Sequence, residues 1–106
     1  MIIASAEYIA GKKVVTTLGL AKGNTIRARH MGRDIAALMR GLIGGEIKEY
    51  TKLLAESREQ CLDRMVADAK QQGANAIIMV RFSTSALLSG AAELLAYGTA
   101  VVVEDE

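Results

Sequence analysis

Cys61 is the only cysteine in this 106-residue chain and its first candidate for chemistry, because a thiolate binds soft metals and metalloids well. It lies in a helical pattern, four residues before Met65 and seven after Leu54, on the apolar stripe. A buried cysteine in such a place behaves as a small hydrophobic side chain. One thiol cannot complete a metal site, but a symmetric ring would bring several copies around one axis. Core packing and a soft-metal or metalloid site in an oligomer are therefore both open.

A second candidate is the basic run "RARHMGRD", which holds Arg27, Arg29, His30 and Arg33. In a strand, Arg27 and Arg29 share one face and His30 lies on the other. One interpretation is a site for a small anion or cofactor formed by Arg29, His30 and Arg33. The alternative is a solvated edge with ion pairs between subunits. His30 and Cys61 could also form a nucleophilic dyad, but nothing in their spacing places them within hydrogen-bond reach, so we expect no enzymatic activity.

Arg58 falls within the same apolar stripe as Cys61, where an unpaired cation is costly. We expect a structural ion pair between Arg58 and a carboxylate of another element or subunit. A ligand-binding role in a ring cavity is the alternative.

Three glycines stand in "RGLIGGEIKEY", at positions 41, 44 and 45, just before a helical pattern. A phosphate cradle would follow a strand and precede Lys-Ser or Lys-Thr. Here a helical pattern precedes the glycines, and Glu46 follows at the amides that an anion would need. The glycines therefore predict a corner between two helices.

Alternating residues predict two antiparallel strands, Val14–Leu20 and Thr25–Arg29, joined by a hairpin turn at "KGN", with a short edge strand at Ile2–Ala4. Residues 33–43 repeat apolar side chains with helical spacing. A second helix is predicted from Glu46 to Gln72, about 40 Å long, with Gly73 ending it.

Two further strands, "NAIIMVRFS" and "LLAYGTAVVV", are apolar on both faces, and we expect a hairpin between them. The chain is thus predicted to be a single α+β domain over residues 1–106, an antiparallel sheet in the order β-β-α-α-β-β with two helices on one side. The overlong helix and the two-faced strands predict a symmetric homo-oligomer.

Composition excludes several classes of function. Thirteen Lys and Arg against twelve Asp and Glu give a net charge of +1, which argues against nucleic-acid binding. No apolar run reaches the roughly 20 residues of a membrane span, and the first residues lack the basic and apolar regions of a signal peptide. We expect a cytoplasmic protein with no nucleic-acid or membrane partner.

Four segments, "GLAKGNTI", "RDIAALMRGLIGGEIKEYTKLLAESREQ", "GANAIIMVRF" and "YGTAVVV", resemble in order and spacing the YbjQ-like family of small bacterial and archaeal proteins. The resemblance covers about Glu7 to Val103, and departs from the family pattern at the more hydrophobic residues 82–97. It implies a dodecin-like subunit fold and a pentameric ring. The family carries a heavy-metal-binding label but no agreed catalytic residues.

Together these observations predict a ring-forming binding or scaffold protein of unknown ligand and cofactor. The alternatives are soft-metal or metalloid binding through clustered Cys61 thiols, and small-anion or cofactor binding by the 27–33 junction.

Overall fold

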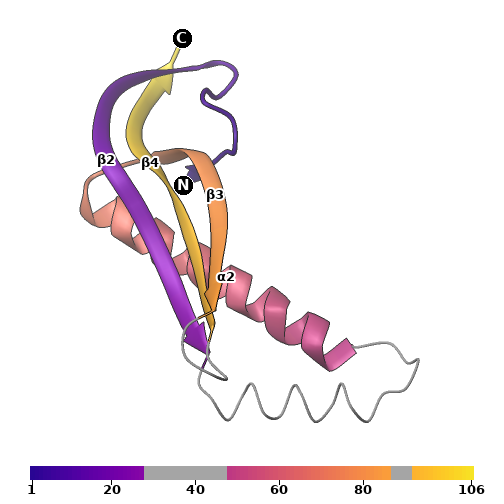
Figure 1. The fold of residues 1–106 in the computed structure, drawn as a ribbon. Coiled ribbons are helices and arrows are strands. Elements are labelled where there is room, and N and C mark those ends of the chain that lie inside the picture. The colour runs from indigo at the N-terminus through magenta and orange to yellow at the C-terminus, as the bar shows by residue number, and fades with distance from the viewer. Residues whose placement is uncertain (28–47, 87–91) are drawn as a thin grey trace.

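The computed structural model describes residues 1–27, 48–86 and 92–106, which form one helix and a four-stranded mixed sheet (Figure 1). The elements are β1 (Ile2–Ile3), β2 (Lys12–Arg27), α2 (Lys48–Gln71), β3 (Ala76–Ala86) and β4 (Ala92–Asp105). The strand order is β1-β3-β4-β2. This confirms the α+β class and the short N-terminal edge strand.

The prediction of a wholly antiparallel sheet is wrong, because β1 pairs with β3 in parallel. Strand β4 pairs antiparallel with both β2 and β3. All of β2 and α2 separates β1 from β3 along the chain, so no short turn forces those two strands to run in opposite directions.

The predicted hairpin at "KGN" is also wrong, because Lys12–Arg27 forms one continuous strand. Its register with β4 continues without a shift from Gly19 to Arg27. Gly23 is buried, and a Cβ there would lie 2.3 Å from the Met65 backbone nitrogen. Glycine at position 23 therefore allows strand and helix backbones to approach closely, a use of glycine that a turn signal does not distinguish.

The long second helix is confirmed as α2, which ends at Gln71. Gly73 has a φ of +90°, its amide donates to the Lys70 carbonyl, and the Ala74 amide donates to the Ala69 carbonyl. This pair of hydrogen bonds forms a Schellman motif, and it confirms the prediction that Gly73 ends the helix. The predicted helix over 33–43 and the glycine corner at 44–45 lie outside the described residues.

Helix α2 covers one face of the sheet, across β2 and β4, and its N-terminal half extends past the strands (Figure 1). The core between the helix and the sheet is formed by small and aliphatic side chains: Ala21, Cys61, Met65, Ala69, Ile77, Val80, Ala96 and Ala100. A smaller cluster contains Ala76, Ile78, Val101 and Val103, against which Ile9 packs. The N-terminal segment thus helps to bury apolar side chains that α2 does not cover.

Strands β3 and β4 pair from Ala76–Val101 to Ala86–Ala92, which confirms the hairpin arrangement of these strands. The residues that connect them, 87–91, lie outside the described part of the chain. A register shift lies between Ile78 and Arg81, where Met79 has a φ of +58°. Gly98 lies opposite this bulge, and a Cβ there would be 2.9 Å from the Ile78 carbonyl oxygen.

Candidate functional site

Cys61 lies at the interface between α2 and the sheet and has no solvent exposure. Its thiol donates a hydrogen bond to the Leu94 carbonyl oxygen at 3.1 Å, and its sulfur lies 3.5 Å from the Thr25 hydroxyl oxygen. Thr25 and Ser57 are the buried polar side chains of the described residues. The helix therefore presents the thiol to the backbone of β4 and a hydroxyl of β2, and this polar contact satisfies groups inside the core.

The surroundings of Cys61 in one chain differ from those that a metal ion needs. Within the residues that the structure describes, no group of three or more His, Cys, Asp and Glu side chains is placed to hold one. The sulfur has a carbonyl and a hydroxyl as neighbours, and a soft metal would need it as a thiolate facing other soft donors. The described residues of one chain therefore do not fit a metal centre at Cys61.

The Cys61 thiol is expected to react with a thiol reagent such as Ellman's reagent about a thousandfold or more slowly in the native protein than in denaturant. Exposure of the thiol requires α2 to leave the sheet, an opening that costs about 5 kcal/mol or more if it is global. A stopped-flow or manual kinetic assay measures both rates. Comparable rates in the two states would contradict the burial and favour an accessible thiol site.

The basic junction lies at the limit of the described residues. Arg27 is the last residue of β2, while Arg29, His30 and Arg33 lie outside the described part of the chain. The anion-site interpretation of these residues stays a prediction.

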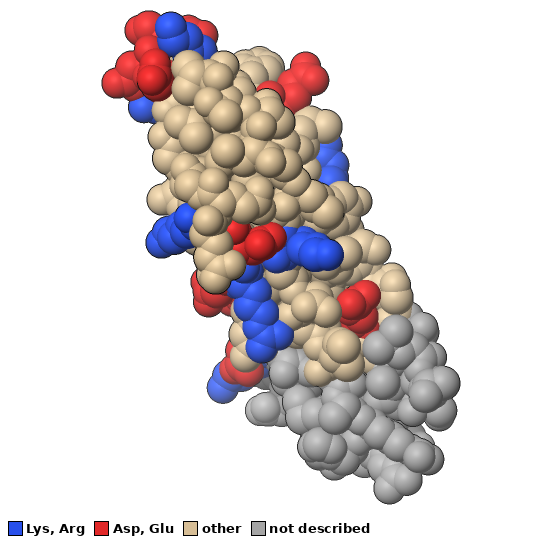
Figure 2. All heavy atoms as spheres, turned by 90° about the vertical axis from the view of Figure 1, so that its left-hand side faces the viewer, with Lys and Arg blue, Asp and Glu red and all other residues tan. Residues whose placement is uncertain are grey.

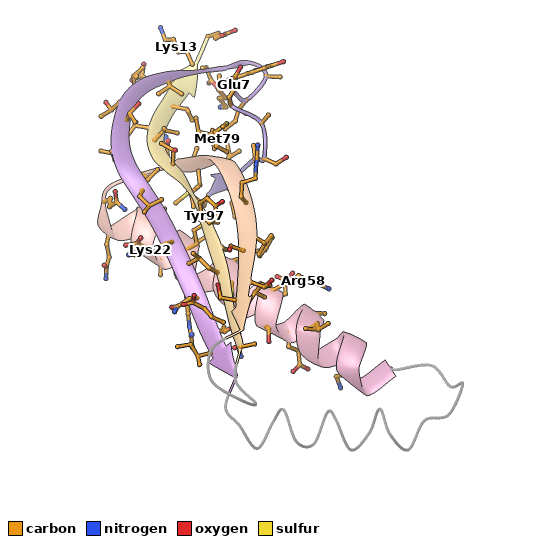
Figure 3. The ribbon with its side chains drawn as sticks, viewed as in Figure 1. Glu7, Lys13, Lys22, Arg58, Met79 and Tyr97 are labelled. Atoms are coloured by element: carbon orange, nitrogen blue, oxygen red, sulfur yellow. The ribbon has the colours of Figure 1, made fainter. Side chains whose placement is uncertain are left out.

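Arg58 is exposed, although its position on the helix belongs to the apolar stripe. It lies on the part of α2 beyond β3 in the view of Figure 3. Leu54, one turn earlier, is 39% exposed for the same reason: the sheet does not reach this part of the helix. Arg58 forms no ion pair with another described residue, so its predicted carboxylate partner stays a prediction.

A polar depression of about 600 Å³ lies beside the outer edge of β2, where α2 overhangs the strand. Its lining combines two cationic and two anionic side chains with amides and small residues: Lys22, Gly23, Asn24, Arg64, Ala67, Asp68, Gln71, Glu93 and Leu95. Figure 2, which faces the β2 side, shows acidic and basic side chains mixed across the middle of this surface.

Most of these charges already have partners. The Asp68 carboxylate accepts a hydrogen bond from the Lys22 backbone amide at 2.9 Å, and the Glu93 carboxylate accepts one from the Asn24 side-chain amide at 3.0 Å. The Arg64 guanidinium donates to the Asn24 carbonyl. Sequence reasoning missed this depression, although the spacing of Arg64, Asp68 and Gln72, four residues apart, marks one polar face of the helix.

Among the described residues, one ion pair lies where β2 begins and β4 ends, between Lys12 and Asp105. The Lys12 ammonium donates a hydrogen bond to this carboxylate, and with its positive charge it holds the pKa of Asp105 below its ordinary value of 3.8. The pair is solvent-exposed and lies across the strand register Lys12–Asp105, so it supports the pairing of strand ends rather than a reactive site.

The described helix is too polar and charged to cross a membrane. A two-layer α+β fold of this kind is also found in a solved structure of a DUF74-family protein of unknown function from Pediococcus pentosaceus. That structure matches with a TM-score of 0.61 over 98% of both chains at 14% sequence identity. At this level the likeness concerns the fold alone.

Residues 1–104 match the family described as "Putative heavy-metal-binding", the YbjQ family, and the chain belongs to it. A UPF0145 protein from Dehalococcoides mccartyi is 60% identical over 98% of this chain and 100% of its own. A UPF0145 protein from Methanosarcina acetivorans is 53% identical over 97% of both chains. A third, from Pyrococcus horikoshii, is 55% identical over 98% of this chain and 89% of its own. The resemblance found in the sequence is therefore confirmed.

Proposed function

We propose that this chain is the subunit of a non-enzymatic homo-oligomeric ring, with a dodecin-like fold and five subunits, that serves as a small binding or scaffold protein. The observation that carries the proposal is the amount of large apolar surface that one chain leaves in contact with water. Twelve large hydrophobic side chains among the described residues are exposed, by 36% to 68%: Met1, Ile2, Ile3, Tyr8, Val14, Val15, Leu18, Leu20, Ile26, Leu54, Met79 and Phe82.

The shape of the chain supports the same proposal. Its radius of gyration is 17.1 Å, against about 13 Å for a compact domain of this length, and its extents are 55 × 26 × 16 Å. A slab this thin cannot cover both faces of its sheet. Apolar surface in this amount marks an interface with another protein surface, and a second copy of the same subunit is the partner always present at equal concentration.

Metal binding is the second candidate, favoured by the family description. The single-chain geometry at Cys61 does not support it, because the thiol faces a backbone carbonyl inside the core. For ring-clustered thiols to bind a metal, α2 would have to turn Cys61 out of the interface in every subunit. Small-anion or cofactor binding by Arg29, His30 and Arg33 is the third candidate, and the described residues neither add to it nor detract from it.

Native mass spectrometry with elemental analysis of untagged protein, purified without chelators, tests these candidates together. The proposal expects one five-subunit species without stoichiometric metal. A monomer at micromolar concentration would overturn the ring. Metal bound at one or more ions per ring and lost in Cys61→Ser would replace the proposal with the thiol alternative.

Arg58→Met is expected to lower the melting temperature of the assembly and to shift its subunits towards dissociation, because we place the partner carboxylate of Arg58 on a neighbouring subunit. Lys52→Met is the matched control: Lys52 is exposed on the same helix, opposite the apolar stripe. Differential scanning fluorimetry and light scattering measure both variants. Unchanged assembly and melting temperature in Arg58→Met would remove the ion pair from the interface.

A further inference from the structure

The two outer edges of the sheet are protected very differently. On the β2 side, Arg64 and Asp68 of α2 and Gln72, the residue that follows the helix, bind the outward-facing backbone groups of alternate strand residues. Gln72 Nε2 donates to the Leu20 carbonyl at 2.9 Å, the Lys22 amide donates to Asp68 Oδ2 at 2.9 Å, and Arg64 donates to the Asn24 carbonyl. We call Arg64, Asp68 and Gln72 the capping ladder. They stand four residues apart, so Arg64 and Asp68 lie on one face of the helix and Gln72, in the turn that follows, continues their line along the strand.

The rest of the β2 edge carries two further devices that discourage strand addition. Its register shifts between Val14 and Thr16 and again between Thr17 and Gly19, which bends the strand. Lysines stand at positions 12 and 13. Bulges, charges and side-chain caps are the devices by which proteins keep an edge strand from pairing with another chain.

On the β3 side, only the first half of the strand is covered. β1 pairs with Ala76 and Ile77, and the segment that follows β1 continues this cover as far as Val80, whose amide donates to the Ala4 carbonyl at 3.1 Å. From Phe82 to Ala86 no backbone group on the outer side has a partner among the described residues.

The segment Phe82–Ala86, which we call the open edge, reads "FSTSA" and has no charge, no proline and no register shift. Phe82 pairs with Ala96, a residue of the core beneath α2, so the Phe82 ring lies on the same face of the sheet as the helix. The helix does not cover this ring, and Phe82 is 44% exposed. A neutral, unbulged strand with an exposed aromatic residue is a template for pairing with another strand.

We propose that the open edge pairs with a strand of a second copy of this chain, while the capping ladder closes the other edge and prevents the sheet from extending there. This inference rests on the proposed ring and names one of its contacts. A folded second copy fits better than an isolated peptide. Cys61 contacts Leu94, which pairs with Thr84 of the open edge, and exposed Leu54 lies two turns earlier on α2, on the same side of the sheet. A single strand would leave the apolar side chains of Leu54 and Phe82 largely uncovered.

The ring also constrains the partner strand. Subunits of an odd-numbered ring meet through two different surfaces, so the open edge of one subunit does not pair with the open edge of the next. Residues 20–24 of β2 are closed by the capping ladder, which excludes them as the partner. The contact is therefore heterologous and joins the open edge to another segment of the neighbour.

Two measurements test the open edge in the full-length protein. Phe82→Lys places a charge on it and is expected to raise the subunit dissociation constant about tenfold or more. Asn24→Lys, a matched charge in the capped part of β2, is expected to leave assembly unchanged. In hydrogen exchange, outward amides of residues 82–86 are expected to exchange more slowly in assembled protein than after dilution, whereas the Lys22 amide does not change.

The capping ladder is tested by Asp68→Ala and Gln72→Ala, each of which frees a backbone group of β2. Both are expected to form species larger than the wild-type assembly in size-exclusion chromatography with light scattering. Asp63→Ala and Gln71→Ala are controls of the same residue types on the same helix and are expected to match wild type. Circular dichroism of each variant separates edge exposure from unfolding.

The outcomes distinguish the two levels of the proposal. Monomeric wild-type protein overturns the ring and this contact together. An assembled wild type whose 82–86 amides exchange rapidly, and whose Phe82→Lys variant assembles normally, overturns the contact and leaves the ring standing. Wild-type size in Asp68→Ala and Gln72→Ala overturns the role of the capping ladder.

Discussion

Gly23→Ala is expected to lower the free energy of unfolding by about 3 kcal/mol or more, at the upper end of what overpacking costs. The added Cβ would lie 2.3 Å from the Met65 nitrogen and 2.4 Å from the Cys61 carbonyl oxygen, which are both backbone atoms of α2. A backbone cannot turn aside as a flexible side chain can. The helix must therefore move off the strand, which would also loosen the packing around Cys61 and Met65.

Urea unfolding followed by circular dichroism measures this loss. Gly11→Ala is the control, since a Cβ at position 11 meets nothing within 4 Å and only its φ of +78° disfavours alanine. That conformational strain costs about 1 kcal/mol. If the two variants lose similar amounts of stability, the close approach of strand and helix is not what glycine provides at position 23.

Met65→Ala is expected to cost about 3 kcal/mol, because it removes a large side chain from the core and leaves a cavity between α2 and the sheet. Met65 is among the largest fully buried side chains of the described residues, and it packs with Cys61 and Ala69. Its loss should lower the urea midpoint without a change in the slope of the transition.

Leu54→Ala is the matched control for Met65→Ala, because both residues belong to the apolar stripe of α2 and Leu54 is 39% exposed. Within one chain it should cost less than about 1 kcal/mol. If Leu54→Ala costs as much stability as Met65→Ala in the assembled protein but less in the dissociated protein, a neighbouring subunit buries Leu54. Equal costs in dissociated protein would contradict the core position of Met65.

Local signals in the sequence predicted much of the fold. The helical spacing of Cys61 and Met65 predicted α2, and Gly73 predicted its end. Both predictions succeeded because helix periodicity and a left-handed C-terminal cap depend on residues close together in the sequence. The β3–β4 pairing followed from two long apolar runs close together in the chain. Gly23 led to the wrong prediction of a hairpin turn, because glycine is typical both of a tight turn and of a close approach between backbones. Only the packing of β2 against α2 decides between the two.

The candidate site was less predictable. The burial of Cys61 followed from its stripe, but its contacts with Thr25 and Leu94 join three elements distant in sequence. The capping ladder likewise depends on how α2 crosses β2, which no local pattern specifies. Arg58 shows the opposite case. Its place in the stripe predicted a covered residue, and the structure leaves it exposed because α2 extends beyond the sheet.

The position of β4 has a consequence for how the chain is made. β4 is the last of the described elements along the chain, yet it lies between β3 and β2 and is the only described strand with which β2 pairs. During synthesis, β2 and α2 emerge from the ribosome well before the strand that joins them to β3. The 16 residues of β2 therefore have no strand partner among the described elements until residues 92–105 have been translated. A nascent chain stalled before residue 92 should thus be a good substrate for chaperones that bind extended apolar segments, and a released chain that contains β4 should be a poor one.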